Sequence, residues 1–213
     1  LNGYPDDVYG YDVALDEPDP SPPVGVNPNG YWSHGTHVAG ITAATTDNGT
    51  GIASLGFNIR FMSVKASPDT GDGRALTHAF DGVYYAMQSG AAVINMSFGG
   101  PVFSNTGNNL MRSARNMGVV MIAAAGNDGD SATQYPAAYN DVIAVGATNQ
   151  NDNKANFSNY GSYVDVMAPG VGIYSTLAGQ SEYGFQSGTS MAAPLVAALA
   201  GLLISDNPLL SPN

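Results

Sequence analysis

The chain of 213 residues combines 44% hydrophobic with only 11% charged residues, together with 27 glycines and 13 prolines. This composition is typical of one compact domain with tight turns and argues against a disordered or coiled-coil protein. Six basic residues against seventeen acidic ones give a net charge of −11. That charge argues against nucleic acid and anionic membranes as partners, because like charges repel. The absence of cysteine excludes disulfides and thiolate zinc sites.

The two ends of the sequence differ from the rest. Residues 1–30 hold six prolines, four glycines and six acidic residues without a sustained period, so we expect an ordered loop region there. No apolar run reaches the roughly 18 to 20 residues that span a bilayer, and Leu1 opens no signal segment. Residues 207–213 resemble a turn that leads into a further helix. We therefore expect both termini to be truncated, with any signal segment or propeptide upstream.

Between these ends, short continuous apolar runs alternate with segments of helical period, with no repeat and no linker. Continuous runs are typical of strands buried on both faces. We therefore predict one α/β domain over residues 1–213, with a three-layer fold in which helices cover both faces of a mostly parallel central sheet. The predicted strands are 60–65, 92–97, 119–125, 142–147 and 164–167. The predicted helices are 76–88 and 107–116, with two more beginning near His34 and Ser190. The last, 190–205, is apolar almost all round, which predicts a central buried helix.

The segment SHGTHVAG places two histidines, His34 and His37, three residues apart at the start of an apolar helical segment. A lone histidine is more often a core or surface residue than a functional one, and a His-x-x-His pair also occurs in metal sites. No further metal ligand of suitable type lies nearby, and the remaining histidine is His78. We expect only one of the pair to face a cleft.

Two other segments carry residues suited to catalysis. GTSMAAP places Ser190 where a glycine-rich loop becomes the apolar helix. A serine there can be a simple N-cap, but the helix N-terminus also suits a nucleophile that generates an oxyanion. AAAGNDG places Asn127 at the carboxyl end of a buried strand, where α/β folds bind ligands. An asparagine there is often a turn former, but its side-chain N–H can donate to an oxyanion.

In this order along the chain, HGTHVAG, AAAGN and GTSMAAP resemble the histidine, oxyanion-hole and serine motifs of the subtilisin-like serine proteases, the subtilases. The likeness continues through INMSFGGP, QYP and VDVMAPG, covers about Gly10 to Asp206, and is nearest to the thermitase-like branch. It implies a subtilisin-like fold and a secreted, extracellular serine endopeptidase. An α/β-hydrolase esterase is excluded, because that class needs a Gly-x-Ser-x-Gly turn with the histidine after the serine.

The resemblance assigns roles to particular residues. His34 becomes the general base, Ser190 the nucleophile and Asn127 the oxyanion donor, assisted by the backbone N–H of Ser190, while His37 becomes structural. Polypeptide substrates, and an N-terminal propeptide as a further partner, would bind a monomeric enzyme by strand addition along two edges, 71–73 and 97–99. The alternative is that the glycines there are only turn formers. The implied substrate-binding residues are Gly71, Asp72, Gly73, Ser97, Phe98, Gly99 and Gly126, with Asp128 at the rim of the primary pocket.

The resemblance also implies calcium as the cofactor. Residues 45–52 resemble a calcium loop of the family in which hard oxygen atoms bind the ion, with Thr45, Asn48, Thr50 and Ile52 in matching positions. A carboxylate that normally completes this site would fall before Leu1. Asp12, Asp16 and Asp19, with Glu17, correspond to a second calcium loop of thermitase-like members. The alternative is a solvated acidic loop.

The third member of a serine protease triad is a carboxylate that holds the histidine. In subtilases it precedes the histidine on an early strand, which we expect to lie before Leu1, and neither Asp12 nor Asp16 matches its motif. Two explanations remain: an ordinary protease of which this is a part, or a catalytically silent subtilase-like domain for binding or structure. Labelling by a serine-reactive phosphonate distinguishes them.

Overall fold

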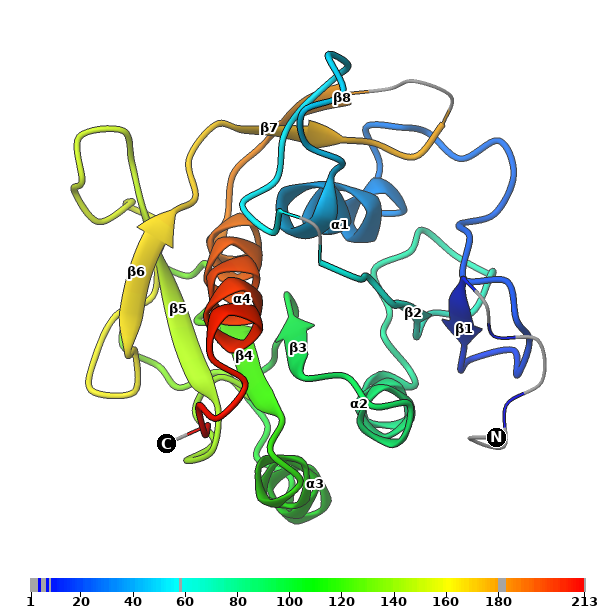
Figure 1. Cartoon of the computed structure of the whole chain (residues 1–213). Coiled ribbons are helices and arrows are strands. Elements are labelled where there is room, and N and C mark those ends of the chain that lie inside the picture. Colours follow the sequence, from blue (N-terminus) through cyan, green and yellow to red (C-terminus); the bar gives the residue numbers. More distant parts are fainter. Residues whose placement is uncertain (1–3, 5–6, 8, 58, 180–182, 213) are drawn as a thin grey trace.

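The computed structural model describes residues 4, 7, 9–57, 59–179 and 183–212 (Figure 1). Helices and strands alternate along the chain, as expected for an α/β protein. The helices are α1 (Ser33–Ala43), α2 (Ala79–Gln88), α3 (Asn105–Asn116) and α4 (Thr189–Asp206). The strands are β1 (Gly10–Asp12), β2 (Ser63–Lys65), β3 (Val93–Met96), β4 (Val120–Ala124), β5 (Ile143–Thr148), β6 (Val166–Pro169), β7 (Ile173–Thr176) and β8 (Tyr183–Gln186).

The largest sheet contains four parallel strands in the order β3-β4-β5-β6. All five predicted strands are confirmed, with boundaries that move by three residues or fewer. Helices cover both faces of this sheet (Figure 1). On one face, α2 and α3 enclose a cluster that includes Met96, Met111 and Met121. On the other, α4 packs on Ile122 and Val145. The predicted layered architecture is thus confirmed.

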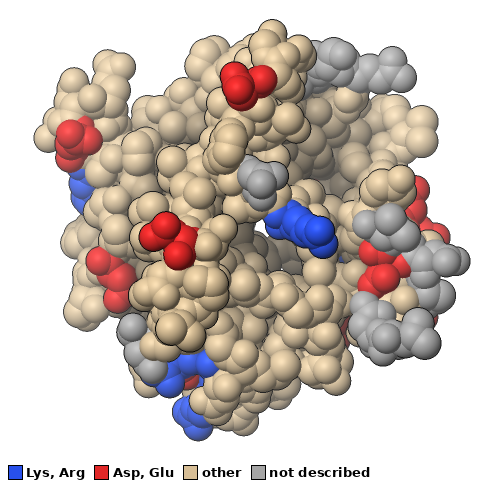
Figure 2. Space-filling model, viewed as in Figure 1, with Lys and Arg blue, Asp and Glu red and all other residues tan. Residues whose placement is uncertain are grey.

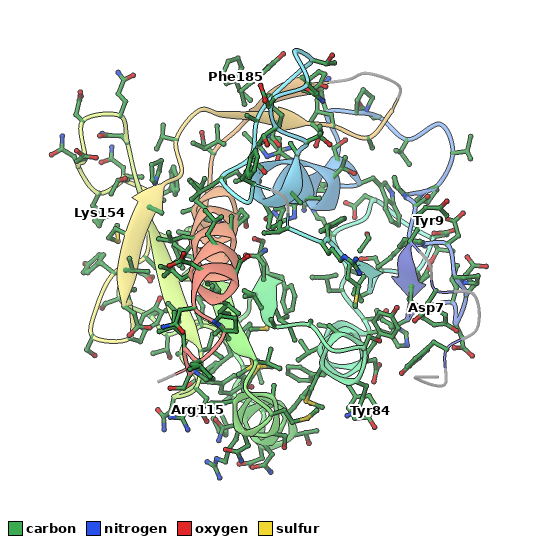
Figure 3. All side chains as sticks on the ribbon, viewed as in Figure 1. Asp7, Tyr9, Tyr84, Arg115, Lys154 and Phe185 are labelled. Carbon is green, nitrogen blue, oxygen red and sulfur yellow. The ribbon has the colours of Figure 1, made fainter. Side chains whose placement is uncertain are left out.

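The remaining strands form two small sheets. β1 and β2 pair in parallel, and β7 and β8 form an antiparallel hairpin that the sequence did not predict. An exposed aromatic pair explains why the hairpin was missed: the tilted rings of Tyr174 and Phe185 pack across it with centroids 4.8 Å apart. Figure 3 labels Phe185 at the outer edge of the hairpin. Because these apolar residues face outward, the hairpin has none of the buried continuous runs that indicated the other strands.

Helix α4 only partly matches the predicted central buried helix. Its buried residues end at Ala198, and Leu199 and Leu203 in the second half are 46% and 51% exposed. Among the described residues, α4 is the one helix long and apolar enough by composition to cross a membrane, with a mean hydropathy of 1.5. This corrects the expectation that no segment reaches that length. The first half nevertheless packs on the sheet as a core helix.

Candidate active site

Ser190 lies in the first turn of α4, directly after a loop that Gly188 anchors. The N–H of Gly188 donates to the carbonyl of Gly170 (2.8 Å), beyond the end of β6. α4 then packs against β3, β4 and β5, so its N-terminus meets the carboxyl ends of the strands, where α/β proteins bind ligands. The N-terminus of a helix favours an anion, because its first backbone N–H groups have no acceptor in the preceding turn and the helix dipole is positive there. The Ser190 hydroxyl therefore lies where an attack on a bound carbonyl would generate an anion next to the N-terminus of α4.

Asn127 lies just after β4, and its orientation is fixed by Thr189. Its side-chain Oδ1 accepts hydrogen bonds from the Thr189 N–H (2.8 Å) and the Thr189 hydroxyl (3.0 Å). Since the Thr189 N–H can only donate, the oxygen of the amide must face Thr189. The Nδ2 group is consequently left as a donor beside the N-terminus of α4. Asn127 is exposed, so this N–H is accessible to a substrate.

Ser97 connects β3 to Ser190 through two reciprocal hydrogen bonds. The Ser97 hydroxyl donates to the backbone carbonyl of Ser190 (2.8 Å), and the Ser190 hydroxyl donates to the carbonyl of Ser97 (3.2 Å). Ser97 is buried, whereas Ser190 is partly accessible. The Ser190 hydroxyl therefore donates to a backbone carbonyl and to no side chain among the described residues. Ser97, predicted to bind substrate, and Ser190, predicted to be catalytic, thus lie in one hydrogen-bonded cluster.

The two histidines of α1 have different environments. The His37 Nε2 lies 3.1 Å from the carbonyl of Ile173 and 3.2 Å from that of Gly184, so the proton belongs on Nε2. The Nδ1 atom is buried and has no hydrogen-bond partner among the described residues. His37 thus joins α1 to the β7–β8 hairpin, as a structural residue would. The His34 side chain is half-buried and forms no hydrogen bond with the described residues. Burial lowers the pKa of His34 below its ordinary value of 6.5, and His37 lowers it further.

The other predicted substrate-binding residues lie on both sides of these groups. Gly73 lies against the indole of Trp32, the residue before α1, so the loop 71–73 adjoins the helix that carries His34. Asp72 accepts the Arg74 N–H (3.0 Å), and Arg74 stacks on Tyr31 at 4.0 Å. Residues 71–73 form no β-strand, so this predicted substrate-binding edge is not a regular edge of a sheet in the structure. Gly99 and partly buried Phe98 follow Ser97 and lead to Gly100, which pairs with Tyr135.

Gly126 occupies a position that only glycine fits. Its φ of +111° lies in the region that side chains disfavour, and an added Cβ would lie 2.8 Å from Cγ of Gln134. Its N–H donates to the Thr189 hydroxyl (3.1 Å), which ties the segment to α4. Asn159 accepts the N–H of Asp128 (2.8 Å) and holds the next turn. Thr189 and Asn159 are thus supporting residues to which the sequence analysis assigned no role, although Thr189 stands within the serine motif.

The predicted calcium loop, residues 45–52, turns tightly through Asp47 and two glycines with positive φ. The side-chain oxygen of Asn48 accepts the N–H of Thr50 (3.0 Å), which folds the loop over its own backbone. Thr45 and Ile52 flank this turn in irregular backbone. Gly51 lies against the Tyr183 ring of β8. The loop therefore presents carbonyl and amide oxygens, which are the donor types that calcium binds.

The acidic residues of the second predicted loop are not brought together. Asp12 is buried and forms an ion pair with Lys65, and its other oxygen accepts the N–H groups of Ala14 (2.8 Å) and Leu15 (3.1 Å). Asp16 accepts the Tyr11 hydroxyl (2.8 Å). Asp19 accepts the Ser21 N–H (2.9 Å). Within the part of the chain that the structure describes, no three acidic or histidine side chains form a metal-binding group. Asp12 in particular has its charge balanced by a lysine.

Comparison with known proteins places this geometry in context. A family model described as the subtilase family matches residues 11–213. The thermophilic serine proteinase of Bacillus sp. (strain AK1) is 49% identical over 198 residues, which are 93% of this chain and 47% of that protein. Thermitase of Thermoactinomyces vulgaris is 49% identical over 172 residues, 81% of this chain and 61% of that protein.

Solved structures agree with these relatives. A cold-adapted subtilisin-like serine proteinase superposes with a TM-score of 0.79 at 32% identity, covering 95% of this chain and 69% of that one. The chain thus spans about half to three fifths of the length of the curated relatives that it matches. The family match covers nearly the whole of the chain. This chain belongs to the subtilase family, in its thermitase-like branch.

Proposed function

We propose that the protein is a serine endopeptidase in which Ser190 is the nucleophile, His34 the general base and Asn127 the oxyanion donor. The observation that carries the proposal is the fixed orientation of Asn127: Thr189 occupies its Oδ1 through two hydrogen bonds, so its Nδ2 remains a donor next to Ser190. A preorganised donor at this point supports chemistry in which an oxygen atom becomes negatively charged. Acyl transfer from a peptide is such a reaction.

In the proposed reaction, Ser190 Oγ attacks the peptide carbonyl carbon while its proton passes to His34. The carbonyl oxygen becomes negative and accepts hydrogen bonds from Asn127 Nδ2 and the backbone N–H of Ser190. His34 then gives the proton to the leaving amine, the C–N bond breaks and an acyl-enzyme remains. Water hydrolyses this ester by the same steps, which restores the Ser190 hydroxyl.

The environment of His34 supports its role as a base. Because burial lowers the pKa of His34, the imidazole is neutral at pH 7 and can accept a proton. The Ser190 hydroxyl must leave its hydrogen bond with Ser97 to reach His34. This hydrogen bond is long for two oxygen atoms, at 3.2 Å, so the rotation costs little.

We further propose that the triad carboxylate is carried by a strand between β2 and β3. These two strands follow one another through α2 but belong to different sheets, in which β2 is parallel to β1 and β3 is parallel to β4. Figure 2 shows the molecular surface hollowed at the centre of this face, between the segments that Figure 1 labels β2 and β3. A parallel strand placed there would end at the same edge as β3, beside the first turns of α1 and α4. Half-exposed apolar side chains, Phe61, Leu199 and Leu203, are consistent with a further packing partner.

The strand proposal is tested with the full-length protein. Replacing the aspartate proposed for this strand should lower kcat by about 3 × 10⁴-fold, the magnitude measured for the triad aspartate of subtilisin. Full turnover by residues 1–213 alone would contradict the proposal.

Polypeptides are the proposed substrates, bound in extended form along residues 71–73 and 97–99. Gly126 supports this proposal because it has no side chain to stand between a substrate and its backbone, and because Gln134 and Asn159 leave no room for one. We place Asp128 at the rim of the primary pocket as part of this proposal, so that a basic substrate side chain would meet its carboxylate, which accepts a hydrogen bond from Gln134 (3.2 Å). An N-terminal propeptide would bind the same edges. We propose a secreted, extracellular monomer, consistent with the net charge of −11.

Calcium is the proposed cofactor at residues 45–52. The loop offers backbone carbonyls and the Asn48 amide oxygen, and bound calcium would hold the loop against Tyr183 of the β7–β8 hairpin. Chelation of calcium should therefore lower the melting temperature of the full-length protein, since loss of a ligand of the native state destabilises that state. Asn48→Ala should reduce the shift. A melting curve that excess chelator leaves unchanged would refute a structural ion.

The endopeptidase itself is tested by hydrolysis of an unfolded polypeptide and of a peptide blocked at both ends. Wild-type full-length protein should cleave both, whereas Ser190→Ala, folded to the same melting temperature, should cleave neither. Cleavage by folded Ser190→Ala would show that another group is the nucleophile. Inactivity of folded wild type would favour a silent binding or structural domain.

A further inference from the structure

Asn95 is a polar residue on an otherwise apolar face of β3. Side chains alternate along a strand, and Ile94 and Met96 are buried in the cluster beneath α2 and α3. Val93 lies on the opposite face, in the cluster that packs on α4. Asn95 shares this face with Val93 and pairs with Ile122 in the neighbouring strand. An amide is thus placed between the sheet and the helix that carries Ser190.

The Asn95 side chain begins a chain of hydrogen bonds that ends at Ser190. Its Nδ2 donates to the hydroxyl of Ser97 (2.9 Å). The Ser97 hydroxyl in turn donates to the backbone carbonyl of Ser190 (2.8 Å). Because the Asn95 N–H occupies an acceptor lone pair of the Ser97 hydroxyl, the single proton of that hydroxyl is directed to Ser190. Asn95 therefore sets the direction of the bond that joins β3 to the first turn of α4.

The oxygen at the other end of the Asn95 amide accepts no hydrogen bond from the described residues. Asn95 Oδ1 is buried and has no hydrogen-bond partner in the described part of the chain. A buried amide that leaves its oxygen unpaired is unfavourable compared with an apolar residue of the same shape. Such a group is expected where it has a role besides packing. The bond that Asn95 gives to Ser97 is the role that the structure offers.

We propose that Asn95 is a positioning residue for catalysis, which holds Ser97 so that Ser97 fixes the Ser190 turn beside Asn127. The inference rests on the proposed function, since it assigns a residue that prepares the same nucleophile. Asn95 touches neither the substrate nor the reacting atoms. It acts through Ser97, and its loss would let the first turn of α4 move relative to the oxyanion donor. A displacement of about 1 Å in such a site can cost about 100-fold in rate.

The experiment measures kcat and KM of the full-length protein on a peptide p-nitroanilide. Asn95→Ala and Ser97→Ala should each lower kcat about tenfold and leave KM within about twofold, since positioning of the nucleophile affects the chemical step. The double variant should lose no more than the larger single loss, because both residues act through one chain of bonds. Ser97→Thr, which keeps the hydroxyl, should restore most of kcat.

The control is Ser104→Ala, which removes the hydrogen bond between the Ser104 hydroxyl and the Gly107 N–H at the start of α3. It should lower the melting temperature without changing kcat. Losses that multiply in the double variant, or kcat unchanged in Asn95→Ala, would overturn the inference. Should Asn95→Ala not fold, an unchanged kcat in Ser97→Ala would overturn it equally. Inactive folded wild type would instead refute the proposed function, and the inference with it.

Discussion

The two sides of the candidate active site differ in how far the described residues organise them. On the nucleophile side, Asn127, Thr189, Ser97 and Ser190 are joined by hydrogen bonds of 2.8 to 3.2 Å. On the base side, the His34 imidazole has no hydrogen-bond partner among the described residues. The first side is built by β3, β4 and α4, which pack on one another. The second side is carried by α1. The elements β3, β4 and α4 therefore preorganise the side of the candidate site that contains Ser190, independently of the side that contains His34.

The largest predicted effect separates the two histidines of α1. His34→Ala should lower kcat by about 10⁶-fold, the magnitude measured for the corresponding histidine of subtilisin, with little change in melting temperature. His37→Ala should instead lower the free energy of unfolding, because two hairpin carbonyls lose their donor. Kinetics and thermal melts of both variants measure the contrast. Equal losses of stability in the two variants would refute the division into catalytic and structural histidines.

A smaller effect tests the oxyanion donor. Asn127→Asp keeps an oxygen for Thr189 but removes the Nδ2 donor, so kcat should fall about 100- to 1000-fold, the range measured for the oxyanion asparagine of subtilisin, while KM changes little. Asn127→Ala should show a similar kinetic loss and, in addition, a lower melting temperature. If Asn127→Asp retained the wild-type kcat, the donor role would be wrong.

Thr189 should give a moderate effect on stability. Thr189→Val removes a hydroxyl that donates to Asn127 and accepts the Gly126 N–H. Leaving these groups unpaired should lower the free energy of unfolding by about 1–3 kcal/mol. Thr189→Ser keeps the hydroxyl and serves as the matched control in denaturant unfolding. Similar free energies of unfolding for Thr189→Val and Thr189→Ser would show that the Thr189 hydroxyl does not stabilise the site.

The smallest effect is the pH dependence that His37 contributes. Burial lowers the pKa of His37 below its ordinary value of 6.5, despite the two backbone carbonyls that favour the charged form. Well above pH 6.5 the imidazole is neutral in both the folded and the unfolded state and contributes no slope. Below it the unfolded chain binds the proton first, so stability falls as the pH falls toward the native pKa. Unfolding from pH 7.5 to 5.0 should show this loss, and His37→Gln should reduce it.

Much of the fold could be predicted from the sequence because doubly buried strands leave continuous apolar runs. The predicted strand 119–125, for example, differs from the observed β4 (Val120–Ala124) by a single residue at each end. The helix α3 begins at Asn105, before the predicted start at Gly107, because Ser104 caps it through the Gly107 N–H (3.2 Å). The exposure of Leu199 and Leu203 could not be predicted. Apolar composition indicates that a helix can be buried, but not which neighbours are present to bury it.

The candidate site could be predicted at its motifs but not at its supports. The motifs assign roles to Ser190, His34 and Asn127. The supporting roles of Asn95 and Thr189, in contrast, are evident only from their hydrogen bonds. The second calcium loop was implied by the resemblance to thermitase-like proteins, whereas in the structure Asp12 forms an ion pair with buried Lys65, which lies 53 residues away in sequence. Pairings of this kind depend on strand register, which the composition of a single segment does not contain.

The most direct test of the account is the reaction of the full-length protein with a serine-reactive phosphonate, followed by peptide mass mapping. The account predicts one phosphonyl group per chain on Ser190, no label in Ser190→Ala, and much slower labelling in His34→Ala. Labelling at another serine, or folded wild-type protein that remains unlabelled, would contradict it.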